Sequence, residues 1–172
     1  LQTALGLEGF SEEDFEACQQ MLVDFCERRM LSVALLDAPL GCDVDEARDW
    51  RDRFDSKYAA MFYPWLRVQD QDQGGTRLVP PCGHIAGLTA AMEQKFGVHR
   101  VAANQVLSDV VGLEQDLGKD WIDLLAPEGV NCIRNFRGRG IRPWGARTLS
   151  SDTAWEQLNV RRLFIMVERS LA

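Results

Sequence analysis

LSVALL at residues 31–36 and YAAMFY at residues 58–63 are the two stretches of sequence that decide the fold. Each stretch is short and almost continuously apolar, without the polar alternation of a strand that faces water on one side. Such stretches are typical of strands buried on both faces of a parallel sheet. A helix is predicted before the first stretch and another between the two. The order helix, strand, helix, strand predicts an α/β fold, a parallel sheet with flanking helices.

The two helices beside these strands are marked by their ends and their faces. SEED at residues 11–14 places a hydroxyl at the cap and acids in the first turn, where the helix dipole favours negative charge. Apolar residues at helical spacing then predict one buried face, made of Phe15, Cys18, Leu22 and Phe25. A second helix is predicted over residues 43–56, and its many charges indicate a surface position.

The middle of the chain predicts one long helix between less regular segments. QDQDQGGT at residues 69–76 is polar and contains glycines, which indicates a loop. Pro80-Pro81 precedes a helix whose apolar face comprises Ile85, Leu88, Met92 and Phe96. We expect irregular structure and short strands over residues 98–112, and a short amphipathic helix over residues 118–125.

The last forty residues predict a hairpin and a helix. Two extended runs, residues 131–136 and 141–149, flank the turn sequence RGRG at residues 137–140. Asn159 is expected to cap the final helix, whose apolar stripe comprises Val160, Leu163, Phe164, Val167 and Leu171. Three arginines of this helix fall outside the stripe: Arg161, Arg162 and Arg169.

Length and composition are those of a globular protein. The chain has 172 residues, 46% hydrophobic and 26% charged, enough for one core or for one domain and the start of another. No apolar run reaches the roughly 18 residues that cross a bilayer, and no signal peptide is visible, so no membrane insertion is predicted. Because the chain starts at Leu1 and stops inside a predicted helix, we expect it to be an excerpt of a longer protein.

Charge is divided unevenly along the chain. Residues 1–130 hold 11 basic and 23 acidic residues, whereas residues 131–172 hold 8 arginines and 3 acids. The net charge of −7 is therefore the sum of an acidic body and a basic end. This division favours two surfaces with different partners, or self-complementary association. Nucleic acid is not a predicted partner, because the acidic body would repel a polyanion.

The sequence offers little catalytic or metal-binding equipment. Phosphate-binding and nucleophile-elbow motifs are absent, and the five scattered cysteines form no CxxC pair. Cys82-Gly83-His84 supplies at most two ligands, so neither a metal ion nor another cofactor is predicted. The acids around Asp45 and Asp49 are interpreted as a solvated helix face.

HIAG at residues 84–87 resembles part of the nucleophile helix of subtilisin-type proteases. In that alignment Val79 stands where the catalytic serine belongs, and valine cannot attack a carbonyl. The resemblance implies a shared scaffold without its chemistry.

A longer series of segments resembles the tail sheath proteins of contractile injection systems. The segments are residues 54–60 (FDSKYAA), 63–66 (YPWL), 79–87 (VPPCGHIAG), 97–99 (GVH), 129–134 (GVNCIR), 138–142 (GRGIR), 144–152 (WGARTLSSD) and 159–163 (NVRRL). The likeness is strong over residues 50–172 and looser before them. Pro143 and Asn135 depart from the hairpin pattern.

The resemblance implies a structural protein and not an enzyme. Family members have a subtilisin-like α/β core followed by an α+β domain next to the tube, which places a domain boundary between residues 1–115 and 116–172. They assemble in the bacterial cytoplasm as stacked rings of six around an inner tube, and contract to drive the tube through a target envelope. Arms at the chain ends join neighbours by strand addition. Baseplate and tail-terminator proteins are further expected partners.

The basic end provides the candidate site of this assembly. Its arginines are expected to form an inward surface that docks on an acidic tube: Arg134, Arg137, Arg139, Arg142, Arg147, Arg161 and Arg162. Pairing of several of these arginines within the subunit is an equal alternative. Two other functions stay open, a divergent hydrolase and a small-ligand module that binds at the strand ends near Asp37-Ala38-Pro39.

Overall fold

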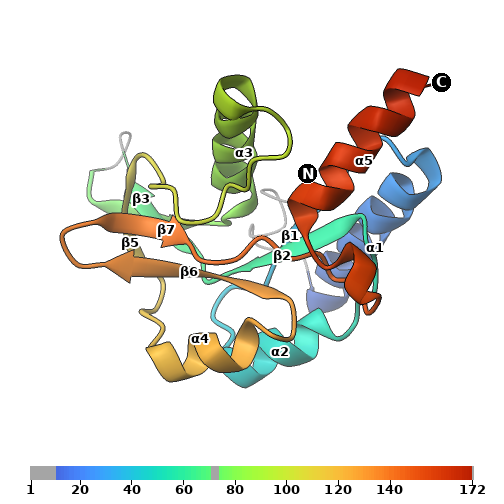
Figure 1. Cartoon of the computed structure of the whole chain (residues 1–172). Helices are drawn as coiled ribbons and strands as arrows, with labels where there is room; N and C mark the ends of the chain where they lie inside the picture. Colours follow the sequence, from blue (N-terminus) through green and yellow to red (C-terminus); the bar gives the residue numbers. More distant parts are fainter. Residues whose placement is uncertain (1–10, 71–73, 172) are drawn as a thin grey trace.

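The computed structural model of the chain describes residues 11–70 and 74–171 (Figure 1). The elements are, in chain order, α1 (Glu12–Arg29), β1 (Ala34–Asp37), α2 (Val44–Arg51), β2 (Ala59–Tyr63), β3 (Leu66–Gln69), β4 (Thr76–Val79), α3 (Cys82–Phe96), β5 (Val110–Leu113), α4 (Lys119–Leu125), β6 (Val130–Phe136), β7 (Gly140–Pro143), the 3-10 turn η2 (Thr153–Trp155) and α5 (Leu158–Leu171). None of the helices in the described ranges is long and apolar enough to cross a membrane.

The main sheet has the strand order β1-β2-β6-β7. Strands β1, β2 and β6 are parallel, with Ala34 opposite Ala59 and Met61 opposite Val130. Strand β7 returns antiparallel to β6. All five residues of β2 are buried, which confirms the interpretation of the apolar stretch at residues 58–63. The first strand begins at Ala34, three residues later than predicted.

A second sheet has the order β4-β3-β5. Short strands were predicted in the region of β5, whereas β3 and β4 were not predicted. Strand β3 follows the cis Tyr63–Pro64 bond and pairs antiparallel with both neighbours. Its alternation of buried Leu66 and Val68 with outward Arg67 and Gln69 spans only four residues. The polar segment predicted as a loop is in part the turn between β3 and β4, and residues 71–73 lie outside the described ranges.

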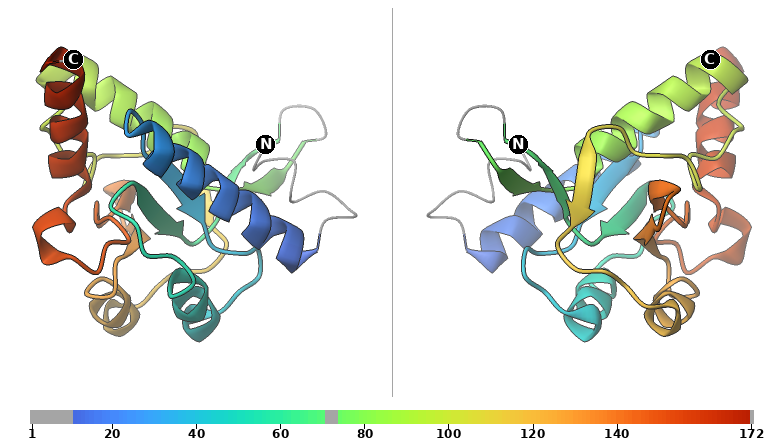
Figure 2. Two further views of the ribbon diagram at one scale, coloured as in Figure 1. Left: turned by 90° about the vertical axis from the view of Figure 1, so that its right-hand side faces the viewer. Right: turned by 90° about the vertical axis from the view of Figure 1, so that its left-hand side faces the viewer.

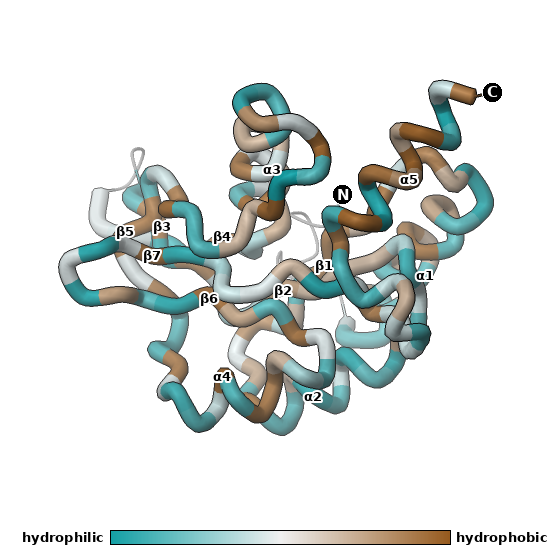
Figure 3. The backbone as a smooth tube through the Cα atoms, viewed as in Figure 1, coloured by the Kyte–Doolittle hydropathy of each residue, from teal (hydrophilic) through white to brown (hydrophobic). Residues whose placement is uncertain are grey.

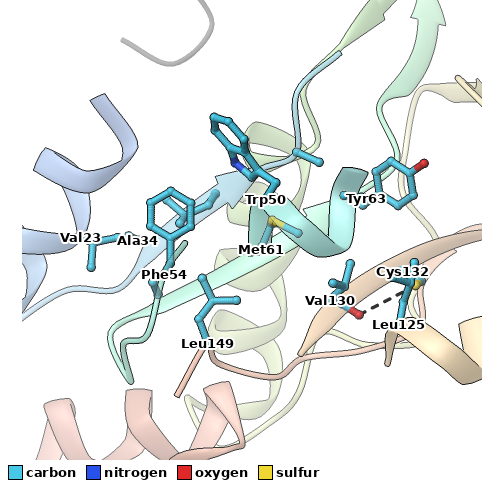
Figure 4. Packing of buried hydrophobic residues seen from close by; sticks show 14 of the residues in the cluster. Val23, Ala34, Trp50, Phe54, Met61, Tyr63, Leu125, Val130, Cys132 and Leu149 are labelled. Atoms are coloured by element: carbon cyan, nitrogen blue, oxygen red, sulfur yellow. Dashed lines mark hydrogen bonds between the residues drawn. The ribbon is translucent and has the colours of Figure 1, made fainter. Parts of the chain in front are cut away.

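Two hydrophobic clusters lie on opposite faces of the main sheet. The odd residues of β2, from Ala59 to Tyr63, belong to a cluster with side chains of α1, α2 and α4 (Figure 4). The even residues, Ala60 and Phe62, belong to the cluster that includes α3 and the second sheet. Because successive side chains of a strand point to opposite faces, one five-residue strand serves both clusters.

The predicted helix starts agree with the structure better than the predicted buried faces do. Ser11 and Asp43 each form a capping box, at α1 and α2 respectively. Helix α2 is shorter than predicted, since it ends at Arg51. The predicted apolar face of α1 is wrong beyond Phe15, because the residues that are buried are Phe15, Gln19, Val23 and Cys26. Residues Leu22 and Phe25 are exposed instead.

The prediction that the apolar stripe of α5 is buried is also wrong for most of this helix. Its buried residues are Leu158, Arg161 and Ile165, whereas Phe164, Val167 and Leu171 are exposed. Arg161 therefore occupies a core position, although the apolar pattern predicted that it would lie outside the buried face.

The predicted division after residue 115 falls between β5 and α4. Strands from both sides of that point, β2 and β6, pair in the main sheet. The first hydrophobic cluster likewise joins Phe15 and Trp50 to Leu125 and Val130. One sheet and one core thus continue through the position of the predicted boundary.

Candidate functional site

The β6–β7 hairpin carries four of the seven arginines predicted to form a partner surface. The hairpin itself confirms the prediction, although β7 ends at Pro143 and not at residue 149. Gly138 and Gly140 have φ angles of +73° and +84° at the turn, a conformation that side chains with a Cβ rarely adopt. The hairpin lies at the edge of the main sheet farthest from β1 (Figure 1).

The four hairpin arginines have no acidic partner among the described residues. Arg137 and Arg139 are exposed at the turn. Arg134 lies over the ring of Phe136, 4.9 Å from its centroid. Arg142 donates to the backbone oxygens of Arg139 and Asn104, at 2.7 and 3.1 Å. Their positive charge is therefore uncompensated within the described chain.

The other three arginines of the predicted set lie elsewhere and are paired within the chain. Arg147 pairs with Glu156, and Arg162 pairs with Glu93 of α3. Arg161 is 1% exposed and pairs with Glu168. These three arginines therefore pair within the subunit, as the alternative prediction had it.

Aromatic side chains accompany the hairpin arginines. Phe136 and Trp144 pack with their ring centroids 5.1 Å apart, and Trp144 is 45% exposed. Tryptophan and arginine are over-represented among the residues that dominate protein–protein binding. The hairpin therefore has the composition of a protein-binding surface with a positive charge.

The strand-end location proposed for a small ligand is filled by protein. Asp37 and Ala38 are fully buried. Trp65 Nε1 donates to the Ala38 oxygen at 2.8 Å, and the Asp37 oxygen accepts from Gln19 Nε2 at 2.8 Å. The ligand prediction is wrong at Asp37 and Ala38, because Gln19 of α1 and Trp65, which precedes β3, occupy this position.

The carboxyl group of Asp37 lies at the start of α3. Its Oδ1 accepts from the backbone N–H of Cys82 at 2.8 Å, while its Oδ2 has no hydrogen-bond partner. Burial raises the pKa of Asp37 to about 7, against the lowering effect of the Cys82 contact. Asp37 therefore keeps its proton in the folded protein at pH values where the unfolded chain has lost it.

An Asp37→Asn variant is expected to be more stable than the unchanged protein at pH 8 and equally stable near pH 4. The Asp37 contribution to the unfolding free energy falls as pH rises from about 4 to about 7, by at most about 1.4 kcal/mol per pH unit. Urea unfolding followed by tryptophan fluorescence from pH 4 to 8 measures the difference. Asp45→Asn on exposed α2 serves as the control. A variant that loses stability at pH 8 would show that the folded protein stabilises the carboxylate.

A groove of about 920 Å³ lies between α3 and the second sheet and holds the residues of the protease resemblance. His84 faces this groove with Asp109, and burial lowers the pKa of His84. Burial and Asp37 raise the pKa of the Cys82 thiol, which disfavours the reactive thiolate. Val79, at the position of the protease serine, ends β4. Ser108 also lines the groove, but no hydrogen bond joins it to His84 among the described contacts.

The described ranges hold no cluster of three or more His, Cys, Asp or Glu side chains arranged to hold a metal ion. Burial raises the pKa of the Cys42 and Cys132 thiols to about 12. Such thiols are protonated and behave as small hydrophobic groups.

Comparison with known proteins identifies relatives over nearly the whole chain. Residues 4–149 match the family model of the phage tail sheath protein central domain. A tail sheath protein of Salmonella phage ViI is 29% identical over 168 residues, which are 90% of this chain and 26% of the phage protein.

Two solved assemblies contain the same fold. The baseplate of the anti-feeding prophage, 6-fold symmetrised, matches with a TM-score of 0.76 and 26% identity over 99% of this chain and 48% of the other. The sheath complex of the extracellular contractile injection system PVC, in its contracted state, matches with a TM-score of 0.76 and 27% identity over 99% of this chain and 50% of the other. The chain therefore spans half or less of each of these relatives.

Proposed function

Because the chain belongs to the phage tail sheath protein family, through the central domain of that family, we propose that it is a structural part of a contractile sheath subunit. The observation that carries the proposal is the match of the whole fold to proteins of two contractile particles. The proposed subunits stack as rings of six around an inner tube and contract to drive the tube through a target envelope. Six-fold symmetry and a contracted state are features of those two relatives.

The remaining parts of the proposal concern architecture and partners. We propose a subtilisin-like core whose chemistry is absent, since Val79 replaces the nucleophile. A tube-proximal domain over residues 116–172 stays a prediction, and the pairing of β2 with β6 shows that the main sheet continues through its start. Baseplate and tail-terminator proteins are the proposed further partners, and assembly is proposed to take place in the bacterial cytoplasm.

Electron microscopy of negatively stained particles tests the sheath role. The sheath protein that contains this chain is produced together with the genes beside it. Striated hollow cylinders are expected. A dispersed monomer under every condition would contradict the proposal. It would favour a ligand-binding or enzymatic role for the groove between α3 and the second sheet.

We propose the hairpin as the surface that faces the inner tube. Arg134, Arg137, Arg139 and Arg142 supply positive charge that fits an acidic tube. Exposed ion pairs contribute only about 0–1 kcal/mol each. A ring of six subunits multiplies such weak contacts, so the tube is held before contraction and released during it.

An Arg137→Glu, Arg139→Glu double variant is expected to leave most sheaths without a tube. Reversing two exposed charges turns attraction into repulsion at every subunit, while the fold is unaffected because neither arginine is paired within the described residues. Counting tube-filled and empty sheaths in electron micrographs measures the effect. Arg77→Glu, an exposed charge on β4, is the matched control. Normal filling in the double variant would exclude the hairpin as the tube contact.

A further inference from the structure

Two ends of the molecule carry opposite charge and exposed apolar side chains. One end is formed by α2 and α4, which lie side by side at the bottom of Figures 1 and 2. The other lies at the top of the same views, where α3 pairs with α5 through Glu93 and Arg162 and α1 ends nearby. We name these the acidic end and the basic corner.

The acidic end is defined by exposed aspartates that have no ion-pair partner in the described chain: Asp45, Asp49, Asp116, Asp120 and Asp123. Lys119 is the exposed cation beside them, and Arg48 is occupied by Glu128. Two apolar side chains of α4 stand among these acids. Trp121 is 45% exposed and Leu124 is 40% exposed.

The basic corner is defined by exposed cations without an ion-pair partner in the described chain: Arg28, Arg29, Lys95, Arg100 and Arg169. Three acids of the same region already have partners. Glu27 accepts from Ser56 Oγ at 2.7 Å, while Glu93 and Glu168 pair with Arg162 and Arg161. The corner therefore has a surplus of positive charge.

A cleft of about 260 Å³ opens in the basic corner. Its lining comes from α5, from Glu93 of α3 and from the segments that follow α1 and α3: Leu31, Ser32, Val33, Glu93, Val98, Arg162, Ile165, Met166 and Arg169. Met30, Phe96 and Leu171, at or just after the ends of α1, α3 and α5, are exposed. Figure 3 shows that hydrophobic positions recur along α5. The cleft thus combines apolar side chains with two arginines and one glutamate, and exposed cations surround it. Helix α4 presents exposed apolar side chains among aspartates.

We infer that the acidic end of one subunit docks in the basic corner of a second copy of this chain. Trp121 supplies an aromatic anchor for the cleft, and the aspartates of α4 meet the arginines at the ends of α1 and α5. Since the two surfaces differ and lie at opposite ends, the contact is head-to-tail and continues from subunit to subunit. This inference rests on the proposed sheath role and adds the surfaces through which the subunits stack.

Exchange of charge between the two surfaces tests the contact. The first variant reverses the acidic end by Asp116→Lys, Asp120→Lys and Asp123→Lys. The second reverses the basic corner by Arg28→Glu, Arg29→Glu and Arg169→Glu. Each variant alone is expected to lower the yield of sheaths by about tenfold or more, because both of its ends then carry the same sign. Production of the two variants together is expected to restore sheaths, since each reversed end then meets an end of opposite charge.

Controls separate this inference from the sheath role itself. Glu13→Lys with Arg77→Glu reverses exposed charges outside both ends and is expected to leave the yield unchanged. Thermal melts of each variant confirm that it folds. Absence of sheaths from the unchanged protein would defeat the proposed function. Sheaths from either reversed variant alone, or no recovery in the mixture, would overturn the head-to-tail contact while the sheath role stands.

Discussion

Asn131→Leu is expected to lower the unfolding free energy by about 3–6 kcal/mol, because it removes three buried hydrogen bonds at once. Asn131 is fully buried in β6. Its Nδ2 donates to the Met61 oxygen at 3.0 Å and to the Arg147 oxygen at 2.8 Å, and its Oδ1 accepts from the Arg147 N–H at 2.7 Å. Leucine has a similar size and satisfies none of these backbone groups. The loss is a large part of the 5–15 kcal/mol that is typical of a whole domain.

Chemical unfolding in guanidinium chloride measures this loss. Asn135→Leu is the matched control, since Asn135 lies on the same strand and is exposed. The control is expected to change stability by less than about 0.5 kcal/mol. Equal stability of the two variants would show that the backbone groups of Met61 and Arg147 find other partners.

Arg161→Glu is expected to cost about 3–5 kcal/mol, whereas Arg161→Met is expected to be close to neutral. The guanidinium group lies 4.7 Å from the ring centroids of both Tyr58 and Trp155, and it pairs with Glu168. Glutamate at this position places an uncompensated charge in the core beside Glu168. Methionine keeps the packing and removes a buried charge. It also removes the Arg161 Nε, which is buried without a hydrogen-bond partner.

Thermal unfolding monitored by circular dichroism distinguishes the two substitutions. A loss of 3–5 kcal/mol corresponds to a decrease of about 6–20 °C in Tm for a chain of this length. Arg169→Met on the exposed side of α5 is the control. A severe loss in Arg161→Met would mean that the cation–π contacts themselves hold α5 on the sheet.

Local signals were sufficient where one short segment contained the whole cause of a structure. SEED at residues 11–14 contains both halves of a capping box, and the start of α1 is where it was predicted. The glycines around Arg139 permit the positive φ angles of the turn, and the hairpin was predicted with them. The family resemblance was likewise contained in the order of the residues, and the match of the family model to residues 4–149 confirms the family.

Contacts between distant segments could not be predicted in this way. Gln19 is buried in α1 because its amide group bonds with Asp37 and Trp50, which are 18 and 31 residues away. Without those partners, the apolar pattern assigned the buried face to Leu22 and Phe25. The same applies to Arg161, whose burial requires the rings of Tyr58 and Trp155.

The candidate surfaces likewise depend partly on the sequence alone and partly on the tertiary structure. The basic character of the last forty residues, the hairpin and the absence of catalytic motifs follow from residue types and short spacings, so the sequence by itself determines them. Tertiary structure decided which arginines remain unpaired, because Glu93, Glu156 and Glu168 reach Arg162, Arg147 and Arg161 only in the folded chain. It also gathered the acidic end and the basic corner, since helices far apart in sequence meet only when they pack on one core.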